Sequence, residues 1–147
     1  MKKENPDVIK IKKQDIALTQ LKSAVKMYRI GDYISCLTLS AAAEEILGKM
    51  MLKNKGSNWL KGEVSYLGSI YEYFGKSIPS EKVLIKKINK IKNSLKHNDS
   101  GENEIIEADF EDEAVLFFVK AVKNYYGTFN HMPKSRGIVG LFDELTQ

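Results

Sequence analysis

The chain has 147 residues, which is room for one domain of ordinary size, and its 43% hydrophobic and 29% charged residues exclude an intrinsically disordered polypeptide. The net charge of +4 is too small to indicate nucleic-acid binding by itself, and a single cysteine, Cys36, excludes a disulfide framework and a cysteine-based zinc site. No apolar run is long enough for a membrane span or a secretion signal, so we expect a cytoplasmic protein that makes no membrane contact.

Apolar residues recur every three or four positions along most of the chain, which is typical of amphipathic helices. We expect residues 1–13 to be a flexible segment ahead of the first helix, which ends at Gly31-Asp32. The apolar positions that define this helix are Leu18, Leu21, Val25 and Tyr28. The next helix is expected over residues 33–53 and ends before Gly56. Because it is apolar on more than one face, it should be the central helix, with Cys36 as a buried structural thiol.

Three more helices are expected in the second half of the chain. One covers residues 59–74, although Gly62 and Gly68 weaken it. Another begins at Ser80, a good helix-capping residue, and ends at residues 98–101. Its expected buried stripe consists of Leu84, Ile88, Ile91 and Leu95. Asp109 should cap the last main helix, which ends near Gly127. Residues 128–147 are expected to form a less regular C-terminal extension whose apolar end packs on the bundle or on a partner chain.

No segment alternates between polar and apolar residues in the manner of a strand. The sequence therefore predicts an all-α protein, a single domain over residues 1–147 built as an antiparallel four- to five-helix bundle.

Charge is distributed unevenly between two neighbouring segments of the chain. Residues 76–97 contain seven lysines and one acidic residue, whereas residues 98–113 contain eight acidic residues and no basic one. These segments could pair within the fold or across a dimer, and the lysines offer an anionic ligand one preferred face. Lys86, Lys90 and Lys96 are the residues expected to contact RNA there. Equally, both segments could simply be solvated surfaces.

Most familiar catalytic and cofactor-binding patterns are absent from the sequence. It contains no phosphate-binding glycine motif, no nucleophile elbow and no histidine in a metal-ligand spacing, so we expect no metal and no cofactor. What remains is the segment Lys92-Asn93-Ser94-Leu95-Lys96-His97. Asn93 and His97 lie one helical turn apart, on the side away from the apolar stripe. An imidazole can transfer protons in RNA cleavage, and nearby cations can stabilise the charge that develops on phosphorus. A polar histidine at a helix C-terminus can also do no more than interact with the helix dipole.

This segment resembles the Arg-Asn-x-x-x-His motif of the HEPN superfamily, small all-helical proteins that include toxin and antiviral ribonucleases. Residues 31–45, a turn followed by an alanine-rich helix with Glu44 and Glu45, are also similar to that family. The resemblance implies a homodimer that brings two copies of the motif together in a metal-independent endoribonuclease site. In that site His97 would transfer protons, Asn93 would position the substrate, and Lys92 would stand where the family has arginine. Lysine keeps the charge but lacks the planar fork that binds phosphate through two hydrogen bonds.

Three hypotheses follow for the function. The first is a homodimeric ribonuclease of a toxin–antitoxin or phage-defence system, with RNA and a cognate antitoxin as partners. The second is a non-catalytic HEPN-like module that binds a protein or a nucleotide. The third is a structural helical protein whose basic helix faces solvent.

Overall fold

The computed structural model describes residues 5, 7–97 and 105–147, and these residues form seven helices and no strand. The first three helices are α1 (Lys13–Arg29), α2 (Tyr33–Lys55) and α3 (Trp59–Tyr73). They are followed by α4 (Glu81–Ile88), α5 (Lys90–Ser94), α6 (Phe110–Phe129) and α7 (Arg136–Thr146). The prediction of an all-α protein is confirmed.

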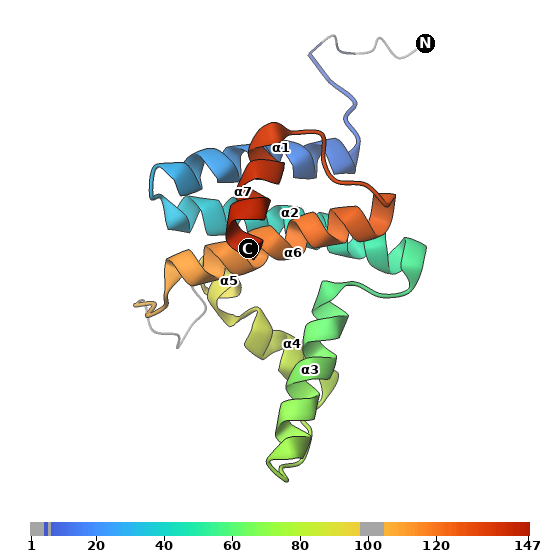
Figure 1. The fold of residues 1–147 in the computed structure, drawn as a ribbon, viewed down its shortest axis with the longest axis vertical. Coiled ribbons are helices and arrows are strands. Elements are labelled where there is room, and N and C mark those ends of the chain that lie inside the picture. The colour runs from blue at the N-terminus through green and yellow to red at the C-terminus, as the bar shows by residue number, and fades with distance from the viewer. Residues whose placement is uncertain (1–4, 6, 98–104) are drawn as a thin grey trace.

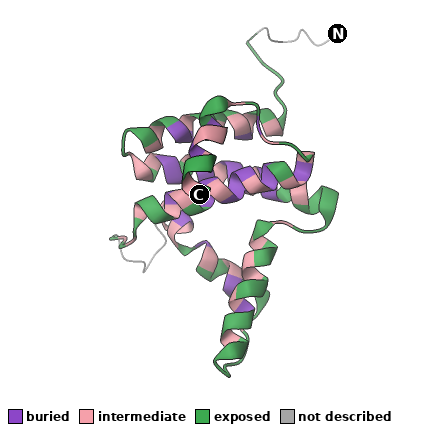
Figure 2. Ribbon diagram, in the orientation of Figure 1, coloured by how far each residue is buried: buried purple, intermediate pink, exposed green. Residues whose placement is uncertain are grey.

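The body of the protein is built on α2, which packs most extensively against α6 on one side and α1 on the other, while α7 crosses α1 and α6 (Figure 1). Buried side chains concentrate in these helices (Figure 2). The largest fully buried side chains are Leu21, Leu37, Leu47, Phe117, Phe118, Ile138 and Leu141. The central position expected for the second helix is confirmed, and Cys36 is fully buried, which raises the pKa of its thiol.

Helices α3 and α4 lie side by side and extend away from this body as an arm (Figure 1). The arm is attached mainly through the first turns of α3. Asn58 caps α3 by accepting a hydrogen bond from the Lys61 amide, and its side-chain Nδ2 donates to the Gly48 carbonyl at 3.0 Å. The buried Asn124 of α6 accepts a hydrogen bond from the Trp59 amide at 3.1 Å. Most of the remaining arm surface is exposed (Figure 2).

Several expected helix ends are confirmed by their local geometry. Ser80 and Asp109 accept hydrogen bonds from the amides of Val83 and Asp112, and Gly56 ends α2 at a φ of 74°. The helix end expected at residues 98–101 is wrong: α5 already ends at Ser94, with Leu95 as its C-cap. Residues 98–104 lie outside the described part of the chain.

Three further expectations for the helices differ from the structure. The single helix expected after Ser80 is divided into α4 and α5, because Asn89 leaves the helical region with a φ of −94° and a ψ of 5°. Gly127 does not end α6. It lies against Met51, whose Cε would be 2.5 Å from a Cβ at this position, so the glycine allows close packing inside the helix. The C-terminal extension contains a regular helix, α7, whose Ile138 and Leu141 are buried in the body.

Candidate functional site

The motif residues lie on α5 and at its C-terminal end, next to α2. The carbonyl of Asn93 accepts hydrogen bonds from the amides of Lys96 and His97, which closes the last turn. His97 and Lys96 are exposed, Asn93 is half-buried, and Lys92 is only 7% exposed. The helical spacing thus placed His97 correctly on the outside, but the lysine next to Asn93 turns into the protein.

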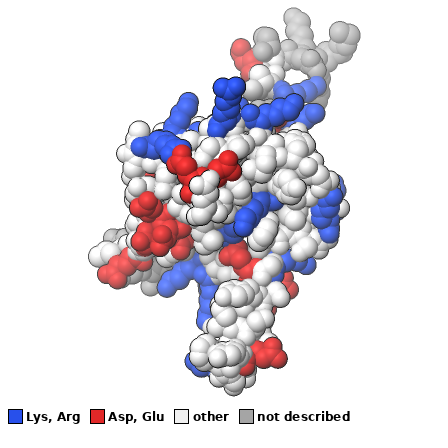
Figure 3. Space-filling model, viewed as in Figure 1, with Lys and Arg blue, Asp and Glu red and all other residues white. Residues whose placement is uncertain are grey.

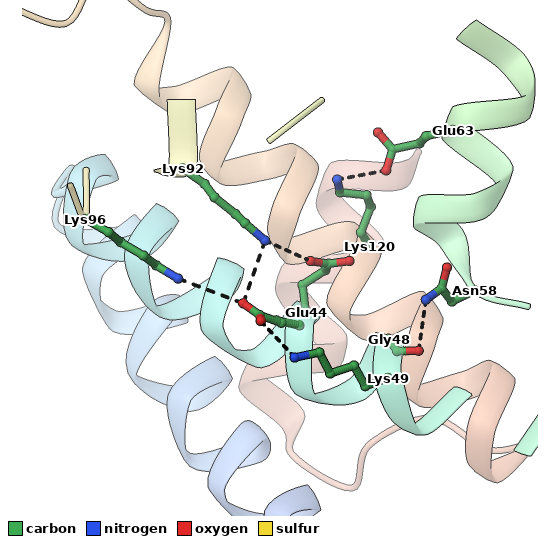
Figure 4. Close-up of polar contacts among 9 residues, drawn as sticks. Glu44, Gly48, Lys49, Asn58, Glu63, Lys92, Lys96 and Lys120 are labelled. Atoms are coloured by element: carbon green, nitrogen blue, oxygen red, sulfur yellow. Dashed lines mark hydrogen bonds and ion pairs between the residues drawn. The ribbon is translucent and has the colours of Figure 1, made fainter. Parts of the chain in front are cut away.

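The ammonium group of Lys92 lies between two carboxylates of α2. Its Nζ is 3.9 Å from Oε2 of Glu44 and 3.9 Å from Oε2 of Glu45 (Figure 4). The same Nζ lies 5.5 Å from the centre of the Phe117 ring. Glu45 also accepts a hydrogen bond from Lys49 at 3.1 Å and lies 4.0 Å from Lys96. The polar contacts of Lys92 are therefore internal, with two acidic groups on one helix.

A second buried lysine also lies close to the Phe117 ring. Lys120 of α6 is 4% exposed, and its Nζ is 2.8 Å from Oε1 of Glu63 on α3 and 3.9 Å from the Phe117 ring centre. Lys92 and Lys120 are both within the usual distance for a cation–π interaction with this ring. Together with Glu44 and Glu63, they form a charged cluster that joins α2, α3, α5 and α6 (Figure 4).

Burial shifts the pKa values of Glu44 and Lys92 in opposite directions. Desolvation raises the pKa of Glu44, and the nearby Lys120 and Lys92 only partly oppose that shift. Desolvation likewise lowers the pKa of Lys92, against the opposing effect of Glu44 and Glu45. The pKa of Glu45 is lowered, because this more exposed carboxylate is bonded to Lys49. A lysine with these neighbours is a structural ion-pair partner more than an open anion-binding group.

Four groups on α4, α5 and the adjoining turn face outward. Lys82, Lys86 and Lys90 are exposed, at intervals of four residues, and His97 is exposed just after the end of α5. No ion pair of Lys82, Lys86 or Lys90 is found among the residues that the structure describes. The described residues also contain no group of three or more metal-binding side chains. The arrangement can therefore bind an anion at an exposed basic face, but it offers no metal site within those residues.

The pair Lys120–Glu63 was not predicted from the sequence. The sequence does indicate that Lys120 is buried. This lysine interrupts the most apolar run of the chain and lies three residues after Phe117, on the same side of the helix. A lysine on an apolar helix face needs a buried acidic partner. Nothing in the sequence identified Glu63, which is 57 residues away on the arm, as that partner.

Fold and site together define an all-α protein with an internal charged cluster beneath a basic surface helix. Comparison of the chain with protein-family models, with curated proteins and with solved structures found no match. None of the helices that the structure describes is both long and apolar enough to cross a membrane.

Proposed function

We propose that this protein is a HEPN-like helical module that binds RNA on the exposed basic face of α4 and α5. It binds the RNA without cleaving it, and Lys92 does not contact the phosphate. The observation that carries the proposal is the division of the motif. Lys92 is enclosed with Glu44 and Glu45, whereas Lys86, Lys90 and His97 remain exposed to solvent.

A phosphate group would have to compete for Lys92 with two carboxylates that already lie 3.9 Å from it. It would also have to approach a side chain that the protein covers almost completely. Both requirements work against the role that the resemblance implies for this position, which is direct contact with the reacting phosphate. The exposed lysines need no such displacement, and phosphate contacts from lysine supply most of the affinity in sequence-independent binding.

The test is the affinity for a fluorescently labelled, single-stranded 20-nucleotide RNA of mixed sequence, measured by anisotropy at several salt concentrations. Lys86→Gln combined with Lys90→Gln should weaken binding and reduce the salt slope by about 0.7 for each lost phosphate contact. The control is Lys22→Gln combined with Lys26→Gln, which removes two exposed lysines at the same spacing from α1. Equal weakening by both double variants, or no binding at low salt, would refute the proposal.

Ribonuclease activity is the second candidate, and the exposure of His97 beside Asn93 is the observation that favours it. In that case the protein should cut the same RNA in the presence of EDTA and leave 2′,3′-cyclic phosphate ends. His97→Ala should then reduce the rate by about 10²–10⁴-fold, the usual contribution of a general acid–base residue. If the RNA stays intact after long incubation with the unaltered protein, the ribonuclease hypothesis is rejected and binding without cleavage is supported.

A further inference from the structure

The arm carries an apolar stripe that the described residues leave largely uncovered; at its base, the Nζ of Lys123 lies 4.4 Å from the centre of the Trp59 ring. Trp59, Tyr66, Ile70 and Tyr73, which we call the α3 stripe, fall within about 60° of one another on the helix at about 100° per residue. All four are exposed; Tyr66 is 71% exposed and Tyr73 85%. The opposite side of α3 faces α4 and the segment before it: Gly68 lies against Ile78, and Gly68 and Leu84 of α4 line the same pocket. On the side shown in Figure 3, the end of the arm is mostly uncharged.

The two ends of the stripe differ in shape. At the base of the arm, Trp59 forms one wall of an apolar cleft of about 370 Å³. The other lining residues are Met51, Val122, Lys123, Tyr126, Gly127, Met132 and Phe142. At the tip, Tyr73 and Phe74 form an edge-to-face pair with ring centres 5.2 Å apart, and both rings project into solvent. One end is thus a hollow and the other an aromatic projection, and they lie on the same helix.

The spacing of these features is symmetric about Tyr66. Trp59 and Tyr73 each lie seven residues from it, about 10 Å along the helix axis at 1.5 Å per residue. Gly62 and Ile70 each lie four residues from it, on or beside the same face. Gly62 costs helix stability relative to alanine, yet a Cβ at this position would meet nothing within 4 Å. Packing inside the chain therefore gives no reason for the glycine, whereas a neighbour in close contact would.

We propose that a second copy of this chain covers the α3 stripe, with the two α3 helices antiparallel and a two-fold axis at Tyr66. This pairing places Gly62 opposite Ile70 of the second copy and lets each aromatic tip enter the cleft beside Trp59 of the other. A two-fold interface requires one surface to be complementary to itself, and a hollow and a projection at equal distances from the axis satisfy that condition.

The exposed area of the stripe is sufficient for such a contact. With aromatic side chains burying roughly 150–250 Å² each, the exposed parts of the stripe and Phe74 amount to about 600 Å² per copy. Two copies then bury about 1,200 Å², the lower limit for a specific interface. This interface differs from one centred on Asn93 and His97, which the resemblance implies, and it does not depend on the proposed RNA binding.

The first experiment measures the sedimentation of the full chain between 1 and 100 µM. The protein should form a dimer, and Tyr66→Lys should weaken it more than tenfold, because it removes a central aromatic group and places two like charges at the axis. Ile30→Lys is the matched control, since Ile30 is 74% exposed on the turn after α1, and it should leave the dimer unchanged. A monomer at 100 µM, or a dimer that Tyr66→Lys does not weaken, would overturn the proposal.

The second experiment tests the register in a Cys36→Ser background. Under mild oxidation, Tyr66→Cys should cross-link with itself. Gly62→Cys mixed with Ile70→Cys should cross-link only as the mixed pair. If each of these two variants cross-links with itself and the mixture gives nothing more, the antiparallel register is wrong. A dimer that is unaffected by Tyr66→Lys but dissociated by His97→Asp would instead place the interface at the motif.

Discussion

Removing the charge of Lys92 tests most directly whether this side chain is held inside the protein. Lys92→Met keeps an unbranched chain that fits the same path and contacts Phe117, but it leaves Glu44 buried, with Lys120 as the remaining cation nearby. Loss of one partner of a buried pair usually costs 3–5 kcal/mol. Because the separation here is 3.9 Å and Lys120 still compensates in part, we expect a loss of about 2–3 kcal/mol in the free energy of unfolding.

The assay is urea denaturation followed by circular dichroism, with the cycle completed by Glu44→Gln and the double variant. If Lys92 and Glu44 stabilise each other, the double variant should be more stable than the sum of the single losses predicts, by about 1–2 kcal/mol. Lys49→Met is the control. It removes an exposed ion pair from α2, the helix that carries Glu44, and should change the free energy of unfolding by less than about 0.5 kcal/mol. If Lys92→Met were as harmless as Lys49→Met, Lys92 would be free to face a ligand and the proposed division of the motif would fail.

Three further predictions concern the same cluster and the glycines of the bundle. Because burial raises the pKa of Glu44, the native state binds its proton more tightly than the unfolded chain, so stability should fall as the pH rises above the ordinary value of 4.5; Glu44→Gln should remove that part of the fall in pH-dependent urea titrations. Lys92→Arg should leave the labelled RNA uncut in EDTA, because the guanidinium would meet the same carboxylates inside the protein, and cleavage that appears on gels would contradict this placement. Gly140→Ala, which meets open space in α7, should raise the unfolding free energy by about 0.5–1 kcal/mol; Gly127→Ala should lack that gain because Met51 must move, and equal melting temperatures of the two variants would refute the close contact.

The parts of the fold that depend on short stretches of sequence could be predicted. Capping by Ser80 and Asp109 and the end of α2 at Gly56 each require only a few neighbouring residues, and all three are found in the structure. The break at Asn89 could not be predicted, because asparagine is tolerated in helices and no proline or glycine marks the position. The projection of the arm was also not predictable, since helical periodicity gives the face that a helix buries but not the angle at which it leaves the body.

For the candidate site, the sequence predicted that His97 faces outward, but it did not predict that the ammonium group of Lys92 lies inside the protein. Lys92 is attached near the boundary between the apolar stripe and the surface, and a lysine stem is long enough to carry the ammonium group either inward or outward. The outcome depends on Glu44 and Glu45, which belong to a helix almost fifty residues earlier. His97 has no comparable partner among the described residues, so its exposure follows directly from the helical spacing.

The cluster of Lys92, Lys120, Glu44 and Glu63 contains equal numbers of acidic and basic groups. This balance limits which residues of the surface above it can bind a ligand. Glu44 and Glu63 face Lys92 and Lys120, so the protein covers two negative and two positive groups around Phe117. Moving Lys92 outward to bind a phosphate would leave Glu44 short of a counter-charge, in a position where burial already disfavours its ionised form. The internal pairing therefore holds α5 against α2, and it leaves ligand binding to the groups that need no such rearrangement, the lysines of the outer face and His97.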